Sequence, residues 1–267
     1  MADPRFFIDP DDALPADEVG AECVLPLSDD DLHHLYHVLR AEVGENIEVV
    51  RRMEWQVRVF QLTAVGADGV TGRLVRAEVL QQPAYTLDLL FGYAKGDKNE
   101  TIVRQATELG VDHLYPTLFA RSVARPDARK REAKTARLRG VATAAARQSH
   151  RVSPPDIAAI MTFARFFSRS PFDRGLYDLI LVPWEEEAAR PLSTTIADIP
   201  LPQNPRVLLV IGPEGGITTD EIVLLRDAGA VTCSLGATIL RVDTACAAAC
   251  AIVADALAAR CGTVDAR

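Results

Sequence analysis

The sequence is poor in cysteine. Its 267 residues include five cysteines, an odd number, and no CxxC pair, which argues against both a disulfide framework and a structural zinc site. His33 and His37 stand four residues apart, a spacing that can place a metal on one helix face, but no third ligand pattern accompanies them. We therefore predict no metal site.

Long apolar runs and a secretory signal are missing as well. No apolar run approaches the roughly 18 residues that a membrane span needs, and the first twelve residues, "MADPRFFIDPDD", are acidic where a signal peptide is basic and then apolar. The chain is 48% hydrophobic and 25% charged, a composition that can bury a full core in one or two domains. We expect a cytoplasmic protein with no membrane partner.

The glycine-rich stretch 208–221, "LLVIGPEGGITTDE", lacks the usual phosphate-binding patterns. Glycine loops between a buried strand and a helix often cradle a phosphate at the helix N-terminus. This loop has no lysine or serine where a P-loop needs them, and its glycines do not form GxGxxG. The glycines therefore predict a loop whose backbone closely approaches a ligand, and this ligand is not a nucleotide phosphate.

An overall basic charge is absent, but the charge is unevenly distributed. The net charge is −8, whereas residues 121–151 hold ten basic and two acidic residues, so this segment carries +8 and the remainder −16. The segment is either a polyanion site or a solvated helix face. Residues 1–80 hold sixteen acidic and seven basic residues, so any RNA contact there must be a small patch.

The hydrophobic pattern divides the chain near residue 82. Short alternating runs at 46–50 and 55–62, with turn signals at Gly44 and 66–69, predict a small antiparallel β domain over residues 1–80. One helix over 28–40, capped by Ser28, interrupts it. Residues 81–86 are predicted to form a linker, and residues 87–267 a second domain.

The second domain alternates strands with helices. We predict strands at 87–93, 113–119, 176–182, 206–211 and 230–235, and helices at 97–109, 130–149, 219–228 and 244–260. Strands that are apolar on both faces and alternate with helices predict an α/β fold with a parallel sheet covered on two sides. Ligands bind at the carboxyl ends of such strands, so the loops at 181–187, 212–216 and 235–245 should converge on one pocket.

Two motifs resemble a known family. "IGPEGGITTDE" (211–221) together with "SLGATILRVDTA" (234–245) resembles the SPOUT class of methyltransferases, and in particular the RsmE family of 16S ribosomal RNA uridine-N3 methyltransferases. "RFFID", "HHLYHVLR" and "GENIEV" look like that family's PUA-like RNA-binding domain. The sequence departs from the family at Thr238, where arginine is usual, and at Asp243, where glutamate is usual.

The resemblance implies a fold, a cofactor and partners. It implies a C-terminal α/β domain with a trefoil knot and a mostly parallel sheet, a small PUA-like β-barrel, and a homodimer that binds S-adenosylmethionine and acts on 16S rRNA or the assembled 30S subunit. The glycines would then allow close backbone approach to adenosine. The expected cofactor-binding residues are Val182, Trp184, Ile211, Gly212, Pro213, Gly215, Gly216, Leu235, Gly236, Ile239 and Leu240. The expected RNA-binding residues are Arg5, His34, Arg40, Lys95, Arg121, Arg125, Arg147, Gln148 and Arg151.

Three residues are candidates for catalysis. Loss of the uridine imide proton creates a negative charge that Arg241 can stabilise, while Asp243 or Glu214 can accept the proton. Each has a structural alternative: Asp243 or Thr244 as the N-cap of the last helix, Glu214 as a partner of backbone donors, and Arg241 as a phosphate ligand. A ribose 2'-hydroxyl target, or an RNA-binding or assembly protein whose transferase site has decayed, stays open as an alternative function.

The last predicted helix, "TACAAACAIVADALAAR", is almost uniformly small and apolar. A helix that is apolar all round is expected to be buried on all sides. In the resembling family such a helix contributes to the dimer interface.

Overall fold

The computed structural model describes residues 3–14, 17–169 and 175–265. The chain forms two compact units: Met1–Gln82 with Ala146–Ser153 and Val264–Arg267, and Pro83–Ala145 with Pro154–Thr263. The expected boundary near residue 82 lies at the division between the two units. The expectation that everything after residue 86 belongs to the second domain is wrong for 146–153 and for the residues from Val264 on. The buried Ala146 and Val152 explain the difference for 146–153, because they pack against Phe7 and Val50 of the first unit.

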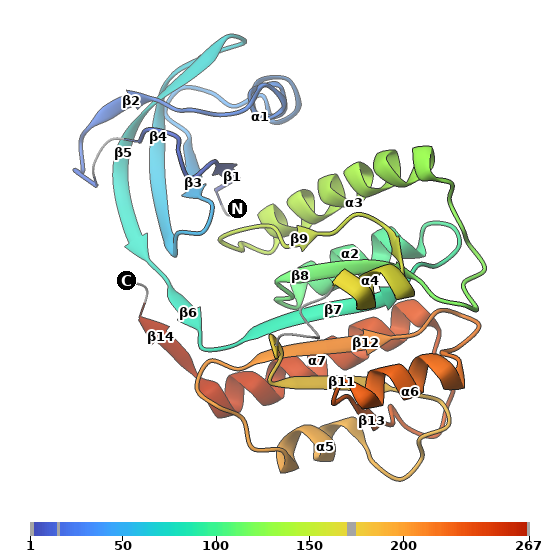
Figure 1. Cartoon of the computed structure of the whole chain (residues 1–267). Coiled ribbons are helices and arrows are strands. Elements are labelled where there is room, and N and C mark those ends of the chain that lie inside the picture. Colours follow the sequence, from blue (N-terminus) through green and yellow to red (C-terminus); the bar gives the residue numbers. More distant parts are fainter. Residues whose placement is uncertain (1–2, 15–16, 170–174, 266–267) are drawn as a thin grey trace. The chain divides into compact units, whose positions relative to one another are not determined.

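The first unit contains a five-stranded sheet in the order β1-β3-β4-β5-β2 (Figure 1). β1 pairs parallel with β3, and the other pairs are antiparallel. The long β4–β5 hairpin turns at Gly66 and Gly69 as predicted, and Leu35 and Phe60 are among the side chains fully buried in this unit's core. The strands are β1 (Arg5–Ile8), β2 (Glu22–Val24), β3 (Asn46–Arg51), β4 (Gln56–Gly66) and β5 (Gly69–Val79).

The helix of the first unit changes type along its length. It begins as α1 (Asp29–His33) and continues as the π-helix η1 (His34–Leu39). The hydroxyl of Ser28 accepts a hydrogen bond from the Asp31 N–H at 3.2 Å, so the predicted cap is confirmed. Arg40, at φ 53°, ends the helix.

The second unit contains a sheet in the order β10-β8-β7-β12-β11-β13, with β9 paired to β8 (Figure 1). Every pair is parallel, which confirms the predicted α/β fold. Sequence analysis missed β9, β10 and the short helices α4 and α5. The strands are β7 (Thr86–Gly92), β8 (His113–Leu118), β9 (Asp156–Ile157), β10 (Met161–Thr162), β11 (Leu179–Pro183), β12 (Arg206–Ile211) and β13 (Val231–Cys233).

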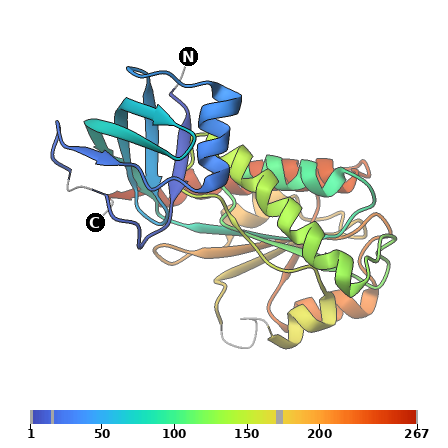
Figure 2. The same ribbon diagram turned by 90° about the horizontal axis from the view of Figure 1, so that it is seen from above.

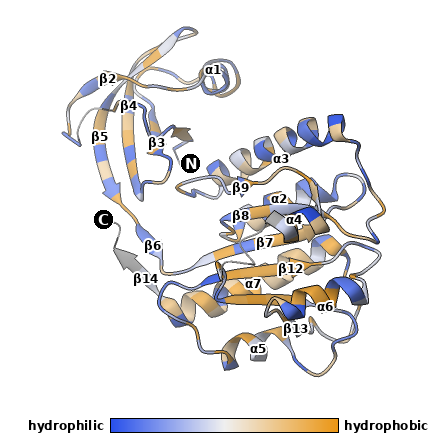
Figure 3. Ribbon diagram, in the orientation of Figure 1, coloured by the Kyte–Doolittle hydropathy of each residue, from blue (hydrophilic) through white to orange (hydrophobic). Residues whose placement is uncertain are grey.

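Alternate side chains of the parallel strands enter two different cores. On one face Leu87 and Leu209 pack among α2, α3, α5 and α7, whereas on the other face Leu90 and Leu208 pack among α4 and α6. α2 and α7 lie beside each other (Figures 1 and 2), and β11 and β12 are hydrophobic along most of their length (Figure 3). The helices are α2 (Lys98–Glu108), α3 (Ala128–Gln148), α4 (Phe163–Arg169), α5 (Leu192–Asp198), α6 (Thr219–Asp227) and α7 (Val242–Cys261).

Helix α7 differs from its prediction in burial. Cys246, Ala249 and Val253 are buried, but Ala251 and Ile252 on another face are exposed. The expectation of burial on all sides is therefore wrong for a single chain. By length and composition α7 could also cross a membrane, which differs from the sequence expectation that no apolar run is long enough. A core helix of a soluble protein passes the same test of length and composition.

The predicted linker at 81–86 contains a short strand. β6 (Gln81–Pro83) pairs with β14 (Thr263–Asp265) in a two-stranded sheet. β7 then begins at Thr86, so the segment between the two units is more ordered than a linker.

Candidate functional site

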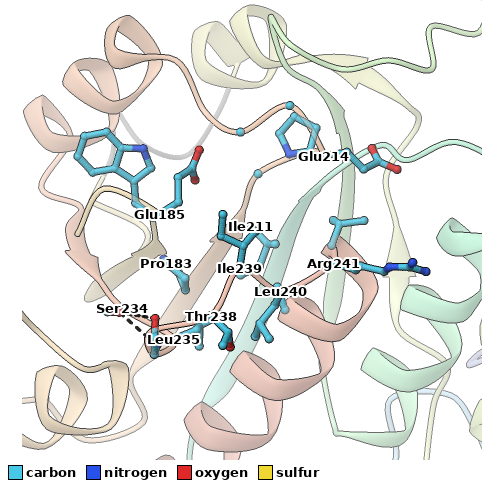
Figure 4. A pocket seen from close by; sticks show the side chains of 18 of the residues that line it. Pro183, Glu185, Ile211, Glu214, Ser234, Leu235, Thr238, Ile239, Leu240 and Arg241 are labelled. Carbon is cyan, nitrogen blue, oxygen red and sulfur yellow. Dashed lines mark hydrogen bonds between the residues drawn. The ribbon is translucent and has the colours of Figure 1, made fainter. Parts of the chain in front are cut away.

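A cavity of about 510 Å³ lies at the carboxyl ends of β11, β12 and β13 (Figure 4). Three loops form it, over residues 183–185, 211–216 and 234–242, with Lys98 and Ala245 completing the wall. The convergence predicted from the strand ends is therefore observed. The lining includes Trp184, Ile211, Gly212, Pro213, Gly215, Gly216, Leu235, Gly236, Ile239 and Leu240 from the expected cofactor set, and Glu214 and Arg241 from the expected catalytic set.

Val182 is the exception among the expected cofactor residues. Its side chain is fully buried in the core shared with α4 and α6. The Val182 side chain does not reach the cavity, because side chains alternate along β11 and this one points into the core.

The glycine turn after β12 is shaped by the protein's own packing. A Cβ on Gly215 would lie 2.6 Å from the backbone oxygen of Arg121, and a Cβ on Gly216 would overlap the carboxylate of Glu185. Gly216 also has a φ of +76°, a conformation that side chains other than glycine rarely adopt. At Gly215 and Gly216 neighbouring protein atoms fill the space that a side chain would need. The packing of the protein itself therefore requires glycine at both positions, in addition to any close approach of a ligand.

The start of α6 fixes the loop beside this turn. Thr218 and Glu221 form a reciprocal capping box, and Glu221 also accepts a hydrogen bond from the Ala120 N–H at 2.8 Å. In the same loop the guanidinium of Arg125 donates to the carbonyl oxygens of Phe119, Ala120 and Ser122. Arg125, expected to bind RNA, is thus engaged in holding its own loop.

Glu214 is paired rather than free. Its Oε1 accepts hydrogen bonds from the Lys98 ammonium at 3.0 Å and from the Lys95 N–H at 3.4 Å. Partial burial on its own raises the pKa of Glu214, but the bonds from Lys98 and from backbone N–H groups outweigh it and hold the pKa below the ordinary value of 4.5. A paired carboxylate with a lowered pKa is a weak proton acceptor, and the alternative that Glu214 satisfies a backbone donor is confirmed.

The loop from β13 to α7 is open to the cavity. Ser234 accepts a hydrogen bond from the Gly236 N–H at 3.2 Å, Gly236 has a φ of +114° with no atom within 4 Å of a built Cβ, and Ile239 is 92% exposed. α7 begins at Val242 with Arg241 as its N-cap, and no side chain caps it. The alternative that Asp243 or Thr244 is the cap is therefore wrong, because both lie inside the first turn.

Two buried polar atoms near the cavity have no hydrogen-bond partner among the described residues: the indole Nε1 of Trp184 and the Oδ1 of Asp243. Trp184 lines the cavity, whereas Asp243 stands between two residues that line it, Val242 and Ala245. An unsatisfied buried polar atom typically costs about 1–3 kcal/mol, so each one calls for an explanation. Three further atoms of this kind in the described part of the chain, Arg51 Nε, Gln105 Oε1 and Arg147 Nε, belong to residues that do not line the cavity.

Several expected RNA-binding residues are engaged inside the first unit. Arg5 is 6% exposed, pairs with Glu48 at 2.8 Å and donates to the carbonyl oxygens of His150 and Arg151. Arg147 pairs with Asp31 and stacks over Phe6. Both charges are compensated within the protein, so the structure does not support RNA binding by Arg5 or Arg147.

The remaining candidates differ in exposure. His34 is half-buried with its ring edge-to-face against Phe6, and Arg151 is half-buried. Exposed side chains are those of Arg40, Lys95, Arg121 and Gln148.

The basic helix α3 also contributes internal contacts. Arg137 pairs with Glu100 at 2.7 Å, and Arg139 donates to the Ile157 carbonyl oxygen. Arg129 and Lys134 are exposed, with no side-chain partner among the residues that the structure describes. The segment 121–151 is therefore partly a structural face and partly an exposed cationic one.

The expected site residues leave out four polar residues of the cavity wall, Lys98, Glu185, Ser234 and Thr238. Lys98 follows the carboxyl end of β7, and Ser234 follows β13, so the strand-end rule applied to every strand would have found both. Glu185 lies in a run of three glutamates whose individual roles a sequence does not distinguish.

Comparisons with known proteins agree on one family. Residues 81–254 match the model of the RNA methyltransferase domain. The chain is 29% identical over 244 residues to the ribosomal RNA small subunit methyltransferase E of Bacillus subtilis, covering 90% of this chain and 92% of the relative. It is 31% identical over 238 residues to the protein of that name from Mycobacterium bovis, covering 89% and 87%.

Solved structures show the same fold. A ribosomal RNA small subunit methyltransferase E from Neisseria gonorrhoeae, bound to S-adenosyl methionine, superposes with a TM-score of 0.76 at 25% identity, covering 94% of this chain and 96% of the other. A structure described only as a hypothetical protein superposes with a TM-score of 0.78 at 26% identity, covering 97% and 98%.

Proposed function

This chain belongs to the RNA methyltransferase domain family, and we propose that it transfers a methyl group from S-adenosylmethionine to the ribosomal RNA of the small subunit. The observation that carries the proposal is the cavity: every residue that lines it falls within the matched range 81–254. The relatives named as small subunit methyltransferases extend the similarity over about nine-tenths of the chain.

The residues of the cavity suit this cofactor. Its volume falls in the range of roughly 300–1,000 Å³ of small-molecule sites, and its walls combine apolar side chains with backbone of the 212–216 and 234–241 loops. S-adenosylmethionine supplies an electrophilic methyl group on a sulfonium, so the protein mainly has to align the acceptor and exclude water.

We propose N3 of a uridine as the acceptor, on the resemblance of the 211–221 and 234–245 motifs. Removing the imide proton leaves a negative charge over O2, N3 and O4, and the exposed guanidinium of Arg241 on the cavity wall can stabilise it. Asp243 is the better candidate for the base, because its Oδ1 is buried without a partner, whereas Glu214 is already bound by Lys98.

Exposed cations near the glycine turn support RNA binding. Lys95 follows β7 with its N–H on Glu214, and Arg121 lies against Gly215. Both side chains are exposed and can contact phosphates, with Arg129 and Lys134 on α3 extending the cationic face.

Further parts of the proposal rest on the family resemblance. We propose a C-terminal trefoil knot, a PUA-like RNA-binding role for the first unit, cytoplasmic localisation and a homodimer. The exposed Ala251 and Ile252 of α7 support the homodimer, because a second copy packed on α7 would remove these apolar side chains from water.

The experiment is methyl transfer to 30S particles isolated from a strain that lacks the chain's gene, with labelled S-adenosylmethionine and mass spectrometry of the product nucleosides. We expect one 3-methyluridine in 16S rRNA, and none with an Arg241→Ala variant. Naked 16S rRNA, assayed in parallel, identifies the preferred substrate. A 2'-O-methylated nucleoside would instead assign a ribose target, and the absence of any product would refute the proposal.

A further inference from the structure

Glu185 is an unpaired carboxylate on the cavity wall. Four charged side chains line the cavity: Lys98, Glu185, Glu214 and Arg241. Glu214 is compensated by Lys98, whereas Glu185 has no hydrogen bond or ion pair with any residue that the structure describes. In Figure 4 the Glu185 side chain lies across the cavity from Glu214 and Arg241. Its charge is therefore left for water or a ligand.

The local structure holds this carboxylate in a defined place. The Trp184 N–H donates to the Cys233 carbonyl oxygen at 3.0 Å, and the Glu187 N–H donates to the Trp184 carbonyl oxygen at 3.0 Å, so residues 184–187 form a tight turn after β11. Gly216 provides the space, because a Cβ there would overlap the Glu185 carboxylate. The fold thus makes room for the group without giving it a partner.

The neighbouring glutamates show that this arrangement is particular to Glu185. Glu187 accepts hydrogen bonds from the Ala189 N–H at 3.0 Å and from the Thr232 hydroxyl at 3.1 Å, so it stabilises the turn. Glu186 is exposed and does not line the cavity. Of the three adjacent carboxylates, Glu185 alone reaches the cavity.

We propose that Glu185 recognises the two ribose hydroxyls of S-adenosylmethionine, an inference that rests on the proposed function. The vicinal hydroxyls are two neighbouring donors, and a carboxylate offers two acceptor oxygens for charge-assisted hydrogen bonds. Among the other side-chain acceptors of the wall, Glu214 is bound by Lys98 and Ser234 is bound to Gly236. Thr238 offers a single hydroxyl oxygen, whereas Glu185 offers two acceptor oxygens and a charge. An acidic residue plays the same part toward ribose in dinucleotide-binding folds.

The test measures ligand binding by calorimetry, independently of methyl transfer. Two ligands are used: S-adenosylhomocysteine, and methylthioadenosine, which keeps the adenosine and lacks the amino-acid end. Glu185→Gln should raise the dissociation constants of both ligands by the same factor, roughly 10- to 100-fold, as expected for a hydrogen bond to a charged group. The matched control Glu186→Gln should leave both constants unchanged, and both variants should keep the wild-type melting temperature.

A modified ligand tests the same contact in the unaltered protein. Methylthioadenosine lacking the 2'-hydroxyl should bind the wild type more weakly than the parent ligand, and Glu185→Gln should reduce that difference. A loss confined to S-adenosylhomocysteine would place Glu185 at the amino-acid end and overturn the inference. Unchanged constants would also overturn it while leaving the proposed function intact, whereas failure of the wild type to bind S-adenosylhomocysteine and S-adenosylmethionine would overturn both.

Discussion

Polar groups at the two ends of the parallel sheet differ in their hydrogen bonding. At the amino ends of β7, β8 and β12, the fully buried Asp88 is bonded to His113, Tyr177 and Arg206. At the carboxyl ends, the Trp184 Nε1 and the Asp243 Oδ1 are buried without partners, and Glu185 is unpaired. Since one sheet supports both arrangements, the fold does not prevent satisfaction of the polar groups at the carboxyl end. At the carboxyl end the two buried atoms lack a partner among the described residues, and the exposed Glu185 carboxylate is left to solvent or a ligand.

The network at the amino end is saturated. Asp88 Oδ1 lies 2.7 Å from His113 Nδ1, and Asp88 Oδ2 accepts hydrogen bonds from the Tyr177 hydroxyl and the Arg206 guanidinium, both at 2.8 Å. The Arg206 guanidinium also stacks over the Tyr177 ring at 5.2 Å. A buried charge is tolerated when it is paired and hydrogen-bonded, so we assign this end to stability and the other to ligand binding.

The largest expected effect comes from Asp243 at the carboxyl end. Asp243→Asn removes the proposed proton acceptor, so turnover at saturating cofactor and RNA should fall by roughly 10² to 10⁴, the usual contribution of general acid-base catalysis. Raising the pH should partly restore the rate, because hydroxide can remove the N3 proton. Because Asp243 is not the cap of α7, the melting temperature should not fall.

Thr244→Ala is the control for this substitution. Thr244 is exposed and lies in the same turn of α7, so its loss should change neither turnover nor stability appreciably. Near-normal turnover of Asp243→Asn would remove Asp243 from the chemistry, and the base would then have to be sought elsewhere.

The second prediction breaks the saturated network. Asp88→Asn removes the charge that compensates Arg206 and His113, and breaking a buried ion pair in this way typically costs about 3–5 kcal/mol. Denaturant unfolding should show this loss, while the affinity of the folded variant for S-adenosylhomocysteine stays unchanged. The control is Asp178→Asn, an exposed residue that accepts from the Arg206 N–H at 2.8 Å. An equal loss of unfolding free energy in both variants would mean that the buried network contributes no more to stability than the exposed hydrogen bond of Asp178.

The third prediction concerns the space beside Glu185. Gly216→Ala places a methyl group where the Glu185 carboxylate lies, at a φ of +76°, and should weaken methylthioadenosine binding. Left-handed backbone alone costs about 1–2 kcal/mol for alanine, and Gly229→Ala measures that cost, because Gly229 has a φ of +87° and open space around it. If both variants lose stability alike but only Gly216→Ala loses affinity, the space itself is functional. Equal affinities would show that Gly216 is needed only for the turn.

A smaller effect is expected from the exposed cations near the cavity. Arg121→Ala should make the salt dependence of RNA binding shallower, by a slope of about 0.9 for a duplex phosphate contact or about 0.7 for a single strand. Arg137→Ala is the control, because Arg137 is also exposed but pairs with Glu100. Identical slopes for Arg121→Ala and the wild type would remove Arg121 from the RNA interface.

The sequence predicted the second unit well because its signals are local. Strands apolar on both faces, such as 206–211, need no knowledge of distant residues, and the rule for parallel sheets then places the cavity at their carboxyl ends. Ten of the eleven cofactor residues that the family resemblance implied line this cavity. Val182 does not line it, because the side-chain alternation along β11 turns Val182 into the core.

The pairing of charged side chains was not predictable in the same way. Arg5 and Arg147 appeared available for RNA, but their partners Glu48 and Asp31 are 43 and 116 residues away along the chain. A count of charges cannot tell a compensated arginine from a free one. The same limit hid the buried network, because His113 and Arg206 meet Asp88 only through the order of β7, β8 and β12.

The smallest expected effect is a pH dependence at the amino end. The hydrogen bond to Asp88 raises the pKa of His113 above its ordinary value of 6.5, with partial burial opposing the shift. A raised pKa in the folded state adds stability that is fully present below pH 6.5 and is lost as the pH rises through the folded-state pKa. Because the His113 side chain is about a third exposed, solvent screening should keep the effect below about 1 kcal/mol. The measurement is the difference in unfolding free energy between the wild type and His113→Gln, which cancels the titration of the other histidines. That difference should shrink as the pH rises above 6.5, and a constant difference would mean that His113 stays neutral in the network.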